Sequence, residues 1–278
     1  SNAYQAKYAE TAEDYARDLG IQATVMDPQG DPAVQFNQIQ DMAAQNPDAI
    51  VVWPTSQNAL IPAIRNAARS DIPVITSNSP IGEAGRRYVV AHTGPDDCAQ
   101  AEQAAEMLGD ALDGEGDIVV VEGTPGYAVS ILRKNCFLDK LADAYPDVTI
   151  LASQTADWNR EKAQTVMETF LTRFGDEIEG VYAFDDGMGL GVISALRGAG
   201  KEPGEVKLVT ANQFGEGWDA MKEGWHTGSN KQSPIDDAIL AIQTAVKVVN
   251  GIDVPELQTI ETPKVTPANV DEFDRPTW

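Results

Sequence analysis

A unit made of an apolar strand, a polar turn, an amphipathic helix and a second apolar strand recurs along this chain of 278 residues. It occupies residues 48–76, 116–154 and 179–210, and its strands are short apolar runs such as IVV and VIT. Apolar runs without polar alternation are typical of parallel strands that are buried on both faces. Strands that alternate with helices in this way form a parallel sheet covered by helices. Because the unit occurs in both halves of the chain, the sequence predicts two similar α/β domains.

The balance of charge limits the partners of the chain. Acidic residues number 43 against 20 basic residues, which gives a formal net charge of −23. Binding to nucleic acid or to an anionic membrane surface depends on neutralising phosphates with Lys and Arg. We therefore expect no nucleic-acid partner and no membrane-surface partner. No apolar run is long enough to predict a membrane-spanning helix.

Cysteine and histidine are too few and too scattered to predict a metal centre. Cys98 and Cys136 form no C-x-x-C pair, and His92 and His226 lie far apart. The stretch DGEGD at 113–117 lacks the length and the distant glutamate of a calcium loop, and it predicts a turn. We expect no metal and no cofactor. The cysteines favour two buried thiols, with a disulfide left open for an oxidising compartment.

Polar residues follow the expected strands at their carboxyl ends, where α/β proteins bind ligands. These polar stretches are residues 77–79, 122–126, 185–186 and 211–213. Amides and carboxylates form paired hydrogen bonds with neighbouring hydroxyl groups. Arg133 and Trp158, close by in the sequence, add a donor and an aromatic face. This set of residues predicts a sugar or a polyol as the ligand and does not suit a phosphate.

The stretch VYAFDDGMGLGVISALRGAG at 181–200 resembles a phosphate-binding loop, but it fails the requirements of one. Val192 stands where a dinucleotide-binding loop has its third glycine, and no Gly-Lys-Ser/Thr sequence is present. We expect Asp186 to be the N-cap of a helix and Asp185 to point toward a ligand. The three glycines that follow would let this helix pack close to the strand.

The motifs taken together are similar to those of the periplasmic binding proteins for ribose- and galactose-type sugars, which are the receptors of ABC importers. The resemblance covers the whole chain and implies two doubly wound, Rossmann-like parallel-sheet domains joined by a three-crossing hinge, with the ligand cleft between them. It implies one domain at 4–96 plus 233–259 and a second at 97–232 plus 260–278. The motifs that carry it are MDPQGDPAVQFNQIQDMAAQNPDAIVVWPTSQNAL, IPVIT, GTPGYAVSILRKNCF, ADWNREKAQTVMETFL, VYAFDDGMGLGVISALRGAG and GWHTGSNKQSP.

The resemblance also implies a set of ligand contacts and no catalytic residue. In the family, the aromatic residue at 158 stacks on the sugar ring; Trp158 as a core aromatic and Arg133 as a surface helix residue are the alternatives. Asn212 replaces an acid of the family, and Ser79 replaces a second arginine of the ribose-type members. The expected contacts are Tyr4, Asn78, Arg133, Trp158, Asp185, Asn212 and Gln232.

The start of the chain departs from the family pattern. Residues 4–20 already correspond to the first helix, and IQATVMDPQ at 21–29 is expected to form the second strand. The first strand of domain 1 is therefore expected to be absent from this chain and encoded upstream. Residues 1–3, Ser-Asn-Ala, are either a remnant of tag removal or part of the native loop before the helix.

The resemblance implies a solute-binding protein that captures a neutral monosaccharide or polyol between two closing domains and delivers it to the membrane permease of an ABC transporter. We expect a monomer located in the periplasm or outside the cell, with a lipid anchor left open. The alternative is the effector-binding domain of a lac-repressor-type transcription regulator, which shares the fold. An enzyme is not expected, because Asp185 has no identifiable catalytic partner and no G-x-S-x-G motif is present.

Overall fold

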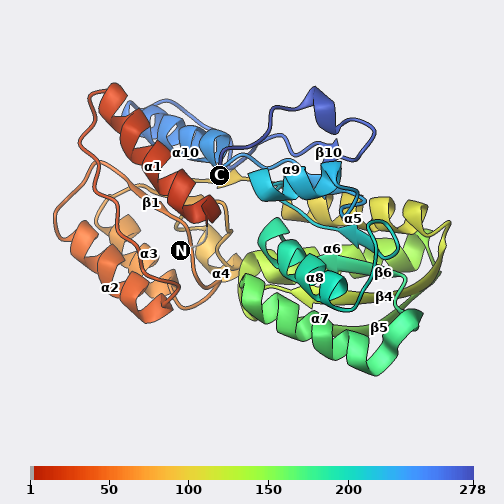
Figure 1. Cartoon of the computed structure of the whole chain (residues 1–278). Coiled ribbons are helices and arrows are strands. Elements are labelled where there is room, and N and C mark those ends of the chain that lie inside the picture. Colours follow the sequence, from red (N-terminus) through yellow and green to blue (C-terminus); the bar gives the residue numbers. More distant parts are fainter. Residues whose placement is uncertain (1–2) are drawn as a thin grey trace. The chain divides into compact units, whose positions relative to one another are not determined.

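The computed structural model describes residues 3–278, and the chain divides into two compact units (Figure 1). Each unit contains its own parallel β-sheet covered by helices, so the predicted α/β fold with two parallel-sheet domains is confirmed. Ser1 and Asn2, which were considered as a tag remnant or a native loop, lie outside the described residues. Unit 1 comprises Ser1–Pro95, Gly126–Ala128 and Ser233–Ile260, and unit 2 comprises Asp96–Pro125, Val129–Gln232 and Glu261–Trp278.

Unit 1 is built on a four-stranded parallel sheet with the strand order β1-β2-β3-β9. Helices α1 and α10 lie on one face of this sheet, and α2 and α3 lie on the other (Figure 1). Every residue of β2 is buried, as the apolar run VIT predicts. The strands are β1 Ile50–Val52, β2 Val74–Ser77, β3 Ala91–Gly94 and β9 Leu257–Thr259; the helices are α1 Ala3–Asp18, α2 Pro32–Ala43, α3 Ile61–Arg69, α4 Glu83–Arg86 and α10 Pro234–Val249.

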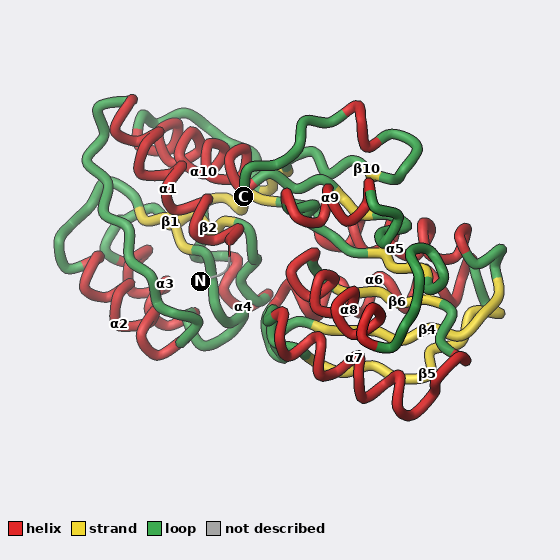
Figure 2. The backbone as a smooth tube through the Cα atoms, viewed as in Figure 1, coloured by secondary structure: helices red, strands yellow, loops and turns green. Residues whose placement is uncertain are grey.

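The segment 21–29 is not a strand, so this prediction was wrong. Figure 2 shows the segment as a loop between α1 and α2. It does not pair in a described sheet, and most of its residues are exposed. Among residues 3–278, β1 pairs with β2 alone, and no strand precedes α1. Strand formation requires ladder hydrogen bonds to a neighbouring backbone. The side-chain pattern of 21–29 suits a strand, but the described residues provide no backbone partner.

Unit 2 contains a second four-stranded parallel sheet, with the order β5-β4-β6-β7. Its core lies on the inner strands, where Val119, Val121, Val181 and Ala183 are fully buried. Helices α7 and α8 pack together on one face, and α5 and α6 cover the other (Figure 1). The strands of this sheet are β4 Glu115–Glu122, β5 Asp147–Thr155, β6 Gly180–Ala183 and β7 Lys207–Val209; β8 Ser229–Asn230 and β10 Lys264–Val265 form a separate antiparallel pair. The helices are α5 Asp97–Ala111, α6 Ala128–Ala144, α7 Arg160–Phe174, α8 Asp186–Gly198 and α9 Gly215–Lys222, with 3-10 turns at Gly175–Glu177 and Val270–Glu272.

The glycines in the first turns of α8 allow this helix to approach its neighbours closely. A Cβ atom on Gly191 would lie 2.2 Å from the carbonyl oxygen of Arg160 in α7. A Cβ atom on Gly189 would lie 2.5 Å from Cγ2 of Thr210, which follows β7. The expected close packing is confirmed at these two positions. The contact of Gly191 is with a helix, however, and only that of Gly189 is with the end of a strand.

Cys98 and Cys136 form a disulfide, which corrects the expectation of two buried thiols. Cys98 lies in the first turn of α5 and Cys136 lies in α6. The two helices cover the same face of the unit 2 sheet, and their side-by-side packing brings the Cα atoms to 5.3 Å, within reach of a bridge. Sequence spacing could not show this, because the contact depends on how the helices pack. The bridge supports an oxidising compartment.

Reduction of this disulfide is expected to lower the free energy of unfolding by about 3 kcal/mol, because the bridge restricts the unfolded chain. The two cysteines are 38 residues apart in the sequence, so the closed loop is long. Urea unfolding with and without a reductant measures the change. The double variant Cys98→Ser/Cys136→Ser is the control, and it should show the low stability with or without reductant. Equal stability of the oxidised and reduced wild type would contradict the prediction.

Candidate functional site

Arg133 is the centre of a polar cluster at the carboxyl end of the unit 2 sheet. Its side chain is buried, with the residue only 1% exposed, so the alternative of a surface helix residue is wrong. The guanidinium Nη2 donates to Oδ1 of Asn212 at 3.0 Å, to Oε1 of Gln232 at 3.1 Å and to Oε1 of Gln100 at 3.0 Å. Asn212 follows β7 and Gln232 follows β8. The fold thus brings three of the predicted contacts together.

A buried ion pair holds the other side of the guanidinium. Nε of Arg133 donates to Oδ1 of Asp97 at 3.0 Å, and Nη1 donates to the carbonyl oxygen of Phe184 directly after β6. Burial raises the pKa of Asp97 to about 6, although the charge of Arg133 opposes the rise. The pair cancels the charge of Arg133 within the cluster.

Asp97 and Gln100 were missed in the sequence because they look like ordinary residues at the start of a helix. Asp96 is the N-cap of α5, and its side chain accepts from the backbone N–H of Ala99 at 3.0 Å. One acid is enough for a cap. The second adjacent acid, Asp97, was the signal that a carboxylate is needed for another purpose.

Trp158 lies beside Arg133 on the loop between β5 and α7. The Arg133 guanidinium carbon is 5.9 Å from the centre of the indole ring, and the ring of Phe184 is 6.3 Å away. The indole also packs against the backbone of Gly123, where a Cβ atom would lie 2.2 Å from Cε2 of Trp158. Trp158 is half-buried and packs against the core cluster of unit 2. Its position beside the polar cluster suits stacking on a ligand, as the family resemblance implies.

Replacement of Trp158 by Ala is expected to raise the Kd for the ligand by about 10- to 100-fold, since an aromatic contact of this kind contributes about 1–3 kcal/mol. Gly123→Ala should weaken binding as well, because its Cβ atom would displace the indole, although Gly123 itself is not a predicted ligand contact. Calorimetric titration measures both variants. The control is Trp218→Phe in α9, which should keep wild-type affinity. An unchanged Kd in Trp158→Ala would exclude the stacking role.

The N-cap of α8 is Asp185 and not Asp186, so the predicted cap was wrong. Asp185 is the N-cap of α8, and its Oδ1 accepts from the N–H of Met188 at 2.7 Å. Asp186, expected to be the cap, is fully buried and accepts hydrogen bonds from Thr210, Ser229 and the N–H of Phe214. The reason is a one-residue shift, because Asp185 is extended and helical geometry begins at Asp186.

One carboxylate oxygen of the buried Asp185 has no hydrogen bond within the described residues. Oδ1 accepts from the N–H of Met188, and no hydrogen bond reaches Oδ2. Asp185 directly follows Phe184, whose carbonyl oxygen accepts from Arg133. Burial raises the pKa of Asp185 to about 6, and the bond from Met188 and the charge of Arg133 oppose this rise.

Unit 1 carries a second polar cluster at the carboxyl end of β2. Asn78 donates through Nδ2 to Oδ2 of Asp237 at 2.6 Å, and the hydroxyl of Tyr4 donates to the same oxygen at 3.0 Å. Both predicted contacts of unit 1 are thus held by one buried carboxylate in the first turn of α10. Trp53 lies 5.8 Å from Tyr4, ring centre to ring centre, and 5.1 Å from Tyr8.

Three residues of this cluster were not predicted. Tyr8 donates to Oγ of Ser77 at 2.7 Å, and Trp53 directly follows β1. Asp237 lies far from Tyr4 and Asn78 in the sequence, in a helix start that already has a cap in Ser233. As with Asp97, the sequence signal for a buried site residue was an acid in the first turn of a helix that already has another N-cap residue.

Three of the seven predicted contacts have a left-handed backbone. The φ angles are 60° for Asn78, 57° for Trp158 and 80° for Asn212. A residue other than glycine in the left-handed region of backbone conformation costs on the order of 1 kcal/mol, and such residues cluster at binding sites. The left-handed backbone therefore occurs at three of the residues that the sequence predicts as ligand contacts.

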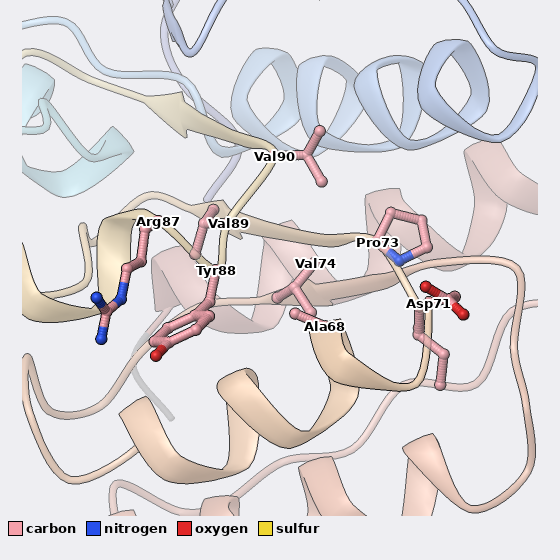
Figure 3. A pocket seen from close by; sticks show the side chains of 9 residues that line it. Ala68, Asp71, Pro73, Val74, Arg87, Tyr88, Val89 and Val90 are labelled. Atoms are coloured by element: carbon pink, nitrogen blue, oxygen red, sulfur yellow. The ribbon is translucent and has the colours of Figure 1, made fainter.

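A pocket of about 380 Å³ in unit 1 lies elsewhere (Figure 3). Residues at the amino ends of β2 and β3, among them Val74, Tyr88 and Val90, line it together with Asp71 and Arg87. None of the seven predicted contacts lines this pocket. Ligands of α/β proteins bind beyond the carboxyl ends of strands, so we assign no function to it.

Neither a cluster of potential metal ligands nor a membrane-spanning helix is found among residues 3–278. Nowhere in this range do three or more His, Cys, Asp or Glu side chains gather in a way that suits a metal ion. None of the helices in the same range has the length and apolar character needed to cross a bilayer.

Comparison with known proteins identifies the family. Residues 1–253 match the family described as periplasmic binding protein domain. The chain is 30% identical over 262 residues to the xylitol-binding protein of Mycolicibacterium smegmatis. This alignment covers 94% of the chain and 73% of that protein. It is 30% identical over 240 residues to the ribose import binding protein of Haemophilus influenzae, covering 86% and 79% of the two chains. The chain therefore belongs to the periplasmic binding proteins, and the resemblance to the sugar-binding members of ABC importers is confirmed.

The solved structures agree with this assignment. A solute-binding protein of an ABC transporter from Bacillus halodurans, with bound myo-inositol, superposes with a TM-score of 0.91 at 25% identity. The alignment covers 98% of this chain and 93% of that protein. The relatives named here are binding proteins, which disfavours both an enzyme and the regulator alternative.

Proposed function

We propose that this chain is the solute-binding component of an ABC importer and that it binds a neutral monosaccharide or polyol. The observation that carries the proposal is the cluster in unit 2, where Arg133 holds the amides of Asn212 and Gln232 beside the indole of Trp158. Amide, guanidinium and aromatic groups in this combination match the hydroxyl groups and the C–H face of a sugar. Relatives named for xylitol and ribose support the same ligand class.

The charges of the cluster favour a neutral ligand. Arg133 is already paired with Asp97, so it has no full positive charge to offer an anion. Asp185 lies beside it and adds negative charge when ionised. Desolvating the charge of a sugar acid or phosphate here would cost several kcal/mol without a dedicated partner. Neutral hydroxyl groups can pair with the Oδ2 of Asp185 and with the amides at little cost.

The proposal includes the route of transport. Each unit carries polar residues at the carboxyl ends of its strands, and we propose that one ligand contacts Asn78 and Tyr4 of unit 1 as well as the cluster of unit 2. A ligand that makes contacts with both units stabilises a closed state over an open one. The closed protein, in the periplasm or outside the cell, then delivers the ligand to the permease of the transporter.

A thermal-shift screen with calorimetric follow-up tests the proposal. Xylitol, D-ribose, L-arabinose and myo-inositol form the neutral set, and D-gluconate and ribose 5-phosphate form the anionic set. A neutral compound should raise the Tm, because a ligand that binds only the folded state stabilises it. Asp185→Asn should weaken its binding markedly, whereas the exposed control Asp139→Asn should not. Tight binding of an anion with the neutral set inert would overturn the proposal.

A further inference from the structure

Gln213 is a buried side chain whose amide has no hydrogen-bond partner among the described residues. The residue is 1% exposed, and neither Oε1 nor Nε2 is paired. A buried amide without partners costs free energy of desolvation, and nearly all buried polar groups in proteins are paired. An amide can form four hydrogen bonds, so their absence among the described residues needs an explanation at this position.

The backbone of Gln213 is strained as well. Its φ angle is 37°, and the preceding residue, Asn212, has a φ of 80°. Two consecutive left-handed residues other than glycine are unfavourable unless the surrounding structure imposes them. Such strain also occurs at Asn78 and Trp158, which the proposed function places in the ligand site.

The loop that carries Gln213 is held by hydrogen bonds on both sides of this residue. Asn212 accepts from Arg133, and the N–H of Phe214 donates to Oδ2 of Asp186 at 2.7 Å. The loop follows β7 at the carboxyl end of the sheet. Gln213 is thus adjacent in sequence to a predicted ligand contact, and its two neighbours are held by Arg133 and by Asp186.

We propose that Gln213 is a ligand contact that selects for neighbouring hydroxyl groups. Its Oε1 accepts from one hydroxyl group of the ligand and its Nε2 donates to the next one, so the bound ligand supplies the partners that the protein lacks. The proposal rests on the proposed function, and it adds a specificity-determining residue to the site.

The test compares the stability and the affinity of Gln213→Met, whose side chain has a similar shape and no amide. Without ligand, its Tm should equal or exceed that of the wild type, because no buried polar group is left unpaired. Its Kd for the member of xylitol, D-ribose, L-arabinose and myo-inositol that the wild type binds most tightly should rise about tenfold. Monodeoxy analogues of that compound extend the test, since removal of the hydroxyl group read by Gln213 should weaken binding to the wild type but not to the variant.

Two further variants keep the result interpretable. Gln35→Met is the matched control, because Gln35 is a buried glutamine whose amide is paired with the backbone oxygen of Trp53 and with Thr55; its Tm should fall. Gln213→Gly tolerates the left-handed backbone and should also lose affinity. A lower Tm of Gln213→Met with unchanged Kd would show a structural amide and overturn the inference. If the wild type binds none of the four compounds, the proposed function fails instead.

Discussion

Arg133→Met is expected to abolish measurable ligand binding and to lower the free energy of unfolding by about 3–5 kcal/mol. The substitution leaves Asp97 as a buried charge without its partner and removes the donor from the amide oxygens of Gln100 and Asn212. Breaking a buried ion pair from one side is costly, because the remaining charge has lost both water and its partner. Urea unfolding measures the stability, and calorimetry with the ligand found in the screen measures the binding.

The double variant Arg133→Met/Asp97→Asn separates the two effects. Removing both charges should recover a large part of the stability, whereas binding should remain lost because the guanidinium is still absent. Arg69→Met is the matched control, since Arg69 lies exposed at the end of α3 and should change neither quantity. Wild-type stability of Arg133→Met would contradict the assignment of Arg133 as the centre of the cluster.

The sequence was sufficient to predict the parallel sheets, because a strand buried on both faces must be apolar throughout. The central run of β4 and the whole of β6 are buried in this way, and each strand is followed by a helix that covers the sheet. The segment 21–29 shows the limit of this reasoning. Its composition suits a strand, yet a strand exists only where a neighbouring backbone completes its hydrogen bonds.

The site could be predicted only in part, for a related reason. Asn212 lies in the polar stretch that follows β7, where position along the chain already indicates the ligand-binding edge, whereas Gln232 was expected only from the family resemblance. Asp97 and Asp237 reach their clusters from the first turns of helices, and their partners lie far away in the sequence. Such pairs depend on tertiary packing, as does the Cys98–Cys136 disulfide. The capping assignment of Asp185 and Asp186 was wrong by one residue because both can cap a helix.

Asp186→Asn is expected to stabilise the protein at about pH 8 and to leave its stability near pH 4 almost unchanged. Burial raises the pKa of Asp186 from 3.8 to about 7, although the bonds from Thr210, Phe214 and Ser229 oppose this. A carboxyl group whose pKa is raised by folding stabilises the folded state below pH 3.8, and this contribution is lost as the pH rises to about 7. At about 1.4 kcal/mol for each pH unit, the loss is roughly 4 kcal/mol.

Asparagine imitates the protonated acid, since its oxygen can accept from the N–H of Phe214 and its NH₂ group can donate to the hydroxyl groups of Thr210 and Ser229. The difference between the variant and the wild type is the quantity to measure, by urea unfolding from about pH 4 to pH 8. Burial lowers the pKa of His92 and His226 to about 4, so their contribution changes in the opposite direction over this range.

Taking the difference removes the histidine contribution, because His92 and His226 are present in both proteins. Asp219→Asn is the matched control, because Asp219 is a surface acid paired with Arg275 that has a lowered pKa, and the substitution should not change the profile between about pH 5 and pH 8. A difference between Asp186→Asn and the wild type that stays constant over the whole range would mean that Asp186 is ionised throughout. The three donors around Asp186 would then outweigh its desolvation, which is the reverse of the balance argued here.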